Sequence, residues 1–257
     1  MGLPASISIP SARPTQPAWR WRLLVVVAVP VALFGLLLNQ APAALAQRPW
    51  SVSLSWVGAL DLALELRLDS LSLLFALLVT GVGSLVALYS IRYMAEAHGL
   101  GRYYASLLIF MAAMLGVVVA GNLVVLFVFW ELTSISSYLL IGFHHEDTAS
   151  QESALQALLI TGVGGLALLA GGVLLYQVYG TFDLAPILSQ PALLRGHRYF
   201  GWILGLILLA AFTKSAQFPF HIWLPNAMAA PTPVSAYLHS ATMVKAGLFL
   251  MARMWPV

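Results

Sequence analysis

Long apolar runs separated by short polar stretches dominate the pattern of hydrophobic and polar positions along this chain. Seven runs reach, or nearly reach, the length that a helix needs to cross a bilayer: residues 23–38, 71–89, 104–120, 123–143, 154–179, 199–218 and 233–254. A shorter piece, residues 221–229, lies among prolines. The pattern therefore predicts an all-α polytopic membrane protein with about seven transmembrane helices, one of them broken by proline.

The first apolar run has two interpretations. Residues 1–22 are polar and contain Arg13, Arg20 and Arg22, and small residues at 41–47 follow the run. A basic start, a short apolar core and small residues are typical of a cleaved signal peptide. A transmembrane helix that contains Pro30 is the favoured interpretation, because a retained anchor suits a polytopic protein.

Residues 60–69 follow a different pattern, because leucine alternates there with polar or small residues. A period of two indicates a β-strand rather than a helix. Gly58 is placed to turn the chain, so that residues 51–56 supply the second strand of a hairpin. We expect this hairpin, residues 50–69, to lie outside the hydrocarbon, because an open sheet edge cannot face lipid.

Composition supports an integral membrane protein. The chain is 61% hydrophobic and 8% charged with a mean hydropathy of +0.90, whereas a soluble domain carries about 25% charged residues. The chain has no cysteine, which excludes disulfides, iron–sulfur clusters and thiolate metal sites. We expect no cofactor, and any redox chemistry must belong to a different polypeptide. The small excess of basic residues does not favour nucleic-acid binding.

The placement of basic residues is more informative than their number. The arginines fall in termini, loops or at a helix end, whereas the only two lysines, Lys214 and Lys245, fall within apolar segments. Lysine changes its protonation state on burial much more readily than arginine does. This sorting favours proton handling over a fixed positive field.

Glu131 is the acidic residue near the middle of an apolar run. A carboxylate at that depth costs about 2.5 kcal/mol or more unless it is paired or neutral. Ser134 and Tyr138 follow it at helical spacing, which predicts a polar stripe on one face. Lys214 is its predicted partner, and the pair serves either as a proton switch or as a structural ion pair between two helices.

Lys214 stands just before a proline-rich break. Pro219, Pro225, Pro231 and Pro233 interrupt the helix beyond it, and broken helices recur at ion sites in transporters. The alternative is a proline kink that only shapes packing. His221, beside the break, either gates the path or faces water.

The last apolar run carries a second predicted polar stripe. Ser235, His239, Thr242 and Lys245 follow one another at roughly helical spacing, with about 9 Å along the axis between the histidine and the lysine. We expect a proton relay on this face, the alternative being a histidine with a purely structural role.

Two other motifs carry weaker signals. His144 to Asp147 contain two histidines and two acids, which could bind a metal but on a polar loop are more typical of solvated surface. The glycines at 162–165 lack the lysine and hydroxyl of a phosphate loop and indicate close helix packing. No nucleophile–base arrangement is evident, so we expect neither catalytic residues nor a metal.

Three long motifs resemble the antiporter-like subunits shared by respiratory complex I and the multisubunit (Mrp-type) sodium/proton antiporters. They are FWELTSISSYLLIG at 129–142, TKSAQFPFHIWLP at 213–225 and APTPVSAYLHSATMVKAG at 230–247. The resemblance covers residues 70–257 and is strongest to the large A subunit of the Mrp branch. It implies half of an antiporter-like fold of about 14 helices, truncated at the C-terminus.

The resemblance also implies function. Glu131 corresponds to the essential glutamate of the family, Lys214 to the lysine of its first broken helix, and His239 with Lys245 to the link into its hydrophilic axis. It implies exchange of Na⁺ for H⁺ within a hetero-oligomer of small membrane subunits in a bacterial inner membrane.

Two departures and two alternatives remain. Family members have two apolar segments before the hairpin where this chain has one, and their second half would follow Val257, so we expect a truncated subunit. The first alternative is a proton-pumping membrane-arm subunit of a quinone oxidoreductase or hydrogenase-type complex. The second is a structural half-subunit that conducts nothing.

Overall fold

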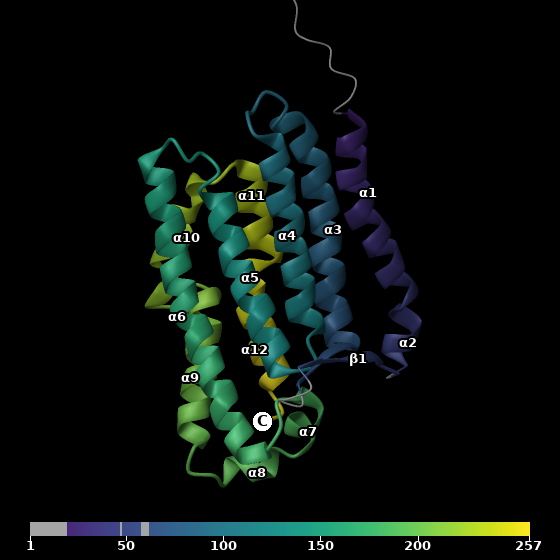
Figure 1. Cartoon of the computed structure of the whole chain (residues 1–257), viewed down its shortest axis with the longest axis vertical. Helices are drawn as coiled ribbons and strands as arrows, with labels where there is room; N and C mark the ends of the chain where they lie inside the picture. Colours follow the sequence, from purple (N-terminus) through teal and green to yellow (C-terminus); the bar gives the residue numbers. More distant parts are fainter. Residues whose placement is uncertain (1–19, 47, 58–61) are drawn as a thin grey trace, which may run out of the picture.

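The computed structural model describes residues 20–46, 48–57 and 62–257 (Figure 1). Four helices in this part of the chain are long and apolar enough to cross a membrane: α3 (Ser70–Tyr93), α4 (Leu100–Val119), α5 (Leu123–Ile141) and α6 (Thr148–Tyr179). They confirm four of the predicted runs. Residues 1–19 and the predicted turn at Gly58 lie outside the described residues.

The first apolar run is a helix, α1 (Arg20–Asn39), with Pro30 inside it. A short helix, α2 (Ala41–Leu45), follows over the small residues. Helix α1 packs along α3 at the edge of the bundle in Figure 1. The apolar part of α1, Val25–Asn39, is shorter than the four long helices.

The predicted hairpin is confirmed. Strands β1 (Trp50–Val57) and β2 (Leu62–Leu68) pair antiparallel, with Trp50 opposite Leu68 and Leu54 opposite Leu64. β2 contacts the ends of α3 and α4, and the Gly121 amide donates to the Glu65 carbonyl at 2.9 Å. The hairpin therefore anchors the tight α4–α5 link at one end of the bundle.

Helices α3 to α6 pack against one another in the order in which they occur in the sequence. In Figure 1, α3, α4 and α5 stand side by side, and α6 packs against both α5 and α9 (Phe200–Lys214). Two short helices, α7 (Leu184–Ser189) and α8 (Pro191–Arg195), close the hairpin end. Large apolar side chains such as Leu85, Leu166 and Trp202 are exposed on the outer faces, as expected of surfaces that face lipid.

Helix α9 ends four residues before the predicted boundary at 218. The Gln217 amide donates to the Phe212 carbonyl at 2.9 Å, and Ala216 adopts φ +52°, which together form a Schellman-type end. The helix therefore stops at Lys214 through its own C-terminal turn, before Pro219 is reached. The prediction that Pro219 interrupts this helix was therefore wrong, because the helix ends before it.

Short turns and helices fill the break after α9. They are η3 (Phe220–Ile222), α10 (Trp223–Asn226) and η4 (Ala227–Ala229). Trp223 is fully buried, and its Nε1–H donates to the Thr213 carbonyl at 2.9 Å. The indole thus ties the returning chain to the end of α9.

The last predicted span, residues 233–254, is not one continuous helix. It consists of α11 (Thr232–Ala236), a π-helical turn η5 (Tyr237–Ala241) and α12 (Met243–Met254). Thr242 interrupts the helical dihedrals at φ −128° and ψ −88°, and its hydroxyl donates to the Tyr237 carbonyl at 2.6 Å. A side chain that bonds the backbone in this way competes with regular helix, which the apolar pattern could not reveal.

Candidate ion-translocation site

Lys214 lies in the protein interior at the last residue of α9. Its side chain is fully buried, and its Nζ donates to Ser134 Oγ at 2.6 Å and to the Trp130 carbonyl at 3.3 Å. Nζ also lies 5.4 Å from the centroid of the Trp130 ring. All of these contacts come from α5, so the lysine side chain links the end of α9 to α5.

Glu131 lies on the same helix, α5, but does not pair with Lys214. Within the described residues, the ion pairs closer than 4.0 Å both involve Asp69. The predicted direct contact between Glu131 and Lys214 is therefore wrong for this structure. The ammonium instead donates hydrogen bonds to Ser134 and to the Trp130 carbonyl.

The carboxylate of Glu131 faces α6. Its Oε1 is buried and has no hydrogen-bond partner in the described part of the chain. A Cβ built on Gly165 would overlap this oxygen, and one built on Gly164 would overlap Thr213 Oγ1. The close packing predicted for the glycines of residues 162–165 is therefore confirmed at Gly164 and Gly165 but not at Gly162, whose Cβ position has nothing within 4 Å. Gly165 leaves the space that Glu131 occupies.

The predicted stripe on α5 is divided between two environments. Ser134 is fully buried and accepts a hydrogen bond from Thr161 Oγ1 at 3.4 Å. Tyr138 is 37% exposed and lies toward the outside of the bundle. Only Ser134 joins the buried polar group around Lys214.

The stripe predicted on the last run is not regular, because the break at Thr242 separates its members. His239 lies on the π-turn with both ring nitrogens buried and without hydrogen-bond partners among the described residues, and its ring is 5.9 Å from that of Trp223. Ser235 donates to the Ala230 carbonyl at 3.3 Å. Lys245 is half-buried on α12.

The prolines and His221 lie around the break rather than inside the polar group. Pro219 precedes η3, Pro225 lies in α10, and Pro231 and Pro233 begin α11. His221 is exposed, with its ring 5.9 Å from that of Phe218. It does not contact Lys214 in this structure.

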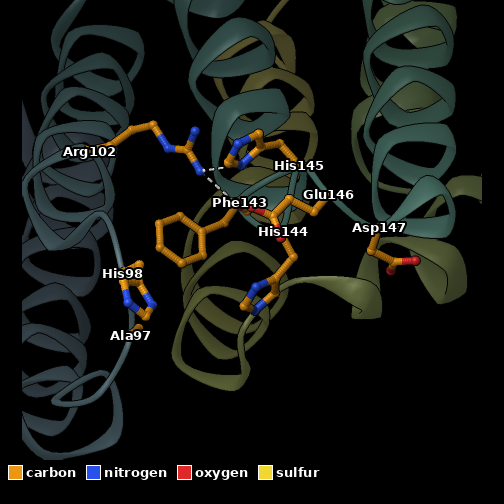
Figure 2. Close-up of a pocket in the computed structure, with 8 residues that line it drawn as sticks. All are labelled: Ala97, His98, Arg102, Phe143, His144, His145, Glu146 and Asp147. Carbon is orange, nitrogen blue, oxygen red and sulfur yellow. Dashed lines mark hydrogen bonds between the residues drawn. The ribbon is translucent and has the colours of Figure 1, made fainter.

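A cavity of about 700 Å³ opens between the α3–α4 and α5–α6 loops. Figure 2 shows Arg102 beside His145, with His98 and His144 on either side of the Phe143 ring. Arg102 donates to the Phe143 carbonyl at 2.6 Å and lies 3.0 Å from His145 Nδ1. Residues 144–147 are exposed, and no three potential metal ligands converge among the residues that the structure describes.

One buried charge cluster was not predicted. Arg253 on α12 is 8% exposed and donates to the Asp69 carboxylate and to Ser72 Oγ, the latter at 2.7 Å. Asp69 also caps the N-terminus of α3. An aspartate directly before an apolar run indicated the cap. Nothing in the sequence linked it to an arginine 184 positions further along the chain.

Two carboxylates meet at the hairpin end of the bundle. Glu65 on β2 and Asp183 before α7 flank the α4–α5 link, where Asn122 Nδ2 donates to Asp183 Oδ1 at 2.9 Å. Burial raises the pKa of Glu65, and the neighbouring charge of Asp183 raises it further against the opposing effect of Arg67. This carboxyl therefore favours its protonated form more than an isolated glutamate does.

The fold and these buried groups define a multi-pass membrane protein with a broken helix around an intramembrane lysine. Residues 120–257 match the family described as "NADH:quinone oxidoreductase/Mrp antiporter, TM". Residues 54–104 match "NADH-Ubiquinone oxidoreductase (complex I), chain 5 N-terminus". The chain belongs to the NADH:quinone oxidoreductase/Mrp antiporter transmembrane family.

Individual relatives agree with this assignment. The chain is 54% identical over 204 residues to a probable K(+)/H(+) antiporter subunit of Rhizobium meliloti (strain 1021), covering 79% of this chain and 20% of the relative. It is 48% identical over 232 residues to a Na(+)/H(+) antiporter subunit of Staphylococcus aureus, covering 90% and 29%. It matches a chain of the Mrp complex from Dietzia sp. DQ12-45-1b with a TM-score of 0.77 and 38% identity, covering 91% of this chain and 28% of that chain.

This chain spans between 20% and 29% of the length of the two curated relatives. The similarity establishes the family and the fold of this portion.

Proposed function

We propose that this chain forms the proton-translocating part of a cation/proton antiporter subunit. In this role it exchanges Na⁺ for H⁺ together with other small membrane subunits in the bacterial inner membrane. The observation that carries the proposal is a fully buried lysine at the end of a broken helix, next to a carboxylate oxygen without a partner in the described part of the chain. Intramembrane ionisable residues are costly and mark ion pathways.

The arrangement supports a movable proton rather than a fixed ion pair. Lys214 is held by one hydroxyl and one carbonyl, so its charge is not locked by a direct salt bridge. Glu131 lies one helical turn from Ser134 on α5, and its Oε1 accepts no hydrogen bond from the residues that the structure describes. A proton can therefore pass between the two groups when the lysine side chain changes its rotamer.

The break gives the lysine freedom to move. Lys214 is the last helical residue, and Ala216 shortly after it has a positive φ of 52°, a conformation that costs a non-glycine residue about 1–2 kcal/mol. Strained backbone of this kind clusters at functional sites. His239 and Lys245, beyond the second break, are the proposed continuation of the path toward the rest of the protein.

The relatives make an antiporter the preferred class. They are named as K(+)/H(+) and Na(+)/H(+) antiporter subunits. We therefore assign the chain to a secondary transporter subunit rather than to an enzyme, with Na⁺ as the first cation to test and K⁺ as the second.

The test measures cation-dependent dissipation of a pH gradient in inverted membrane vesicles. The chain is expressed with its neighbouring genes in a host that lacks antiporters, alongside Glu131→Gln, Lys214→Met and the control Leu204→Met. Leu204 lies on the same helix as Lys214 and is 46% exposed. Its substitution therefore controls for the effect of introducing a methionine into α9 away from the buried polar group. We expect Lys214→Met and Glu131→Gln to abolish exchange at equal protein levels while Leu204→Met retains it. Exchange that survives both substitutions would refute the proposal.

A further inference from the structure

Ser134 is the closest polar partner of the buried lysine. Its Oγ lies 2.6 Å from Lys214 Nζ, whereas the other acceptor, the Trp130 carbonyl, is 3.3 Å away. Both serine and lysine are fully buried. At a fully buried position, the ammonium depends on these few acceptors for its charged form.

The other hydrogen bonds of Ser134 are long, which leaves its oxygen available to the ammonium. The Ser134 hydroxyl donates to the Trp130 carbonyl at 3.4 Å. From α6, Thr161 Oγ1 is 3.4 Å from Ser134 Oγ but only 2.8 Å from the Ala157 carbonyl, which is its better acceptor. The hydroxyl therefore serves mainly as an acceptor for Lys214.

Helix α5 carries a second possible acceptor, the carboxyl group of Glu131. Glu131 precedes Ser134 by three residues, which puts the two side chains on adjoining positions of α5. Its Oε1 is buried and unpartnered among the described residues. Lys214 thus bonds the neutral acceptor Ser134, while a carboxyl oxygen of Glu131 that has no partner in the described part of the chain lies at the adjoining position of the same helix.

We propose that Ser134 is a positioning residue whose hydroxyl holds the Lys214 ammonium apart from the Glu131 carboxylate in the resting state. This inference rests on the proposed proton path through Lys214. Without the hydroxyl, the ammonium pairs directly with Glu131 and becomes harder to release. The rate of exchange then falls, while cation binding elsewhere in the assembly is unchanged.

The chain permits a direct test of the contact, because it contains only two lysines. Solid-state NMR of the ¹⁵Nζ-lysine-labelled protein in lipid membranes gives two side-chain signals, and Lys214→Met identifies the one that belongs to Lys214. Ser134→Ala is compared with Ser136→Ala, a fully buried neighbour whose hydroxyl donates to the Leu132 carbonyl of its own helix at 2.6 Å. Ser134→Cys keeps the side-chain size with a weaker acceptor and serves if the alanine variant does not fold.

We expect Ser134→Ala to shift the Lys214 signal and to lower the maximal exchange rate about tenfold, with the KM for the cation unchanged. Ser134→Cys should change both in the same direction but less, and Ser136→Ala should change neither. An unshifted signal in Ser134→Ala would overturn the inference, as would a shifted signal with a parental exchange rate. Failure of the proposed function is distinct, because it appears as exchange that survives Lys214→Met.

Discussion

Arg253, near the end of α12, forms a two-pronged ion pair with Asp69, the residue that caps α3. Nη2 lies 3.0 Å from Oδ1, and Nη1 contacts Oδ2. The two residues are 184 positions apart. The pair therefore fastens the first long helix after the hairpin to the last helix of the chain, beside the point where Ser72 donates to the Val118 carbonyl of α4.

Removing one partner of this pair is expected to destabilise the fold. Asp69→Ala leaves Arg253, 8% exposed, without its carboxylate, and breaking a buried pair in this way costs about 3 kcal/mol or more. Equilibrium unfolding in mixed detergent micelles measures the change. Glu96→Ala, in the exposed α3–α4 loop, is the control, and equal stabilities of the two variants would contradict the prediction.

The same pair predicts a loss of stability in acid. Burial raises the pKa of Asp69, but hydrogen bonds from Arg253 and from the Ser72 amide, with the charges of Arg253 and Arg67, lower it below its ordinary value. A lowered pKa in the folded state gives stability that is present above the unfolded pKa and is lost as the pH falls through the folded one. We expect this loss below about pH 4, and we expect Asp69→Asn to show a smaller one.

Gly165 is predicted to control the position of Glu131. Because a Cβ at residue 165 would overlap Glu131 Oε1, Gly165→Ala must displace the carboxylate and should lower exchange at least tenfold, as misplacement of a reacting group does. Gly162→Ala is the matched control, since nothing lies within 4 Å of its Cβ position. That variant should keep full exchange and stabilise α6 by about 1 kcal/mol. Similar exchange rates in the two variants would show that the space at Gly165 is unimportant.

Glu65 is expected to make the hairpin contact sensitive to pH. Burial and the charge of Asp183 raise the pKa of Glu65, so its contribution to stability is present below the unfolded pKa and is lost as the pH rises through the raised folded one. Hydrogen exchange at the Gly121 amide, which donates to the Glu65 carbonyl at 2.9 Å, reports on this contact. After correction for intrinsic rates, protection should weaken above about pH 4.

Glu65→Gln tests the cause of that dependence. It keeps the side-chain size but removes the titration, so the protection of the Gly121 amide should become independent of pH. The Gly180 amide, bonded to the Tyr176 carbonyl at 2.7 Å at the end of α6, is the internal reference. An unchanged pH dependence in Glu65→Gln would assign the effect to another group.

Trp223 is predicted to stabilise the break beyond Lys214. Trp223→Phe removes the donor to the Thr213 carbonyl and should cost about 1–2 kcal/mol, the contribution of one buried hydrogen bond with some loss of packing. Trp202→Phe, at a position 72% exposed on α9, makes the same chemical change on the outer surface. Thermal denaturation in detergent should separate the two variants, and equal midpoints would rule out this role.

Local patterns in the sequence predicted the parts of the fold that depend on near neighbours. The alternation at 60–69 identified a strand that the structure places at Leu62–Leu68, because side chains of a strand point to opposite faces in turn. Apolar length identified α3 to α6, because a helix needs about 20 apolar residues to cross a bilayer. Helix ends were less predictable, since the Schellman-type turn at Ala216 and the hydroxyl bond of Thr242 override an uninterrupted apolar run.

By itself, the sequence determined that this is a multi-pass membrane protein with a β-hairpin, and it singled out Glu131 and Lys214 among the costly charges within apolar runs. Only the tertiary structure decided that Lys214 bonds Ser134 and Trp130 instead of Glu131, and that Asp69 meets Arg253. Periodicity and desolvation cost are properties of a few consecutive residues. The choice among acceptors depends on how helices distant in the sequence pack, at distances where a few ångströms decide which hydrogen bond forms.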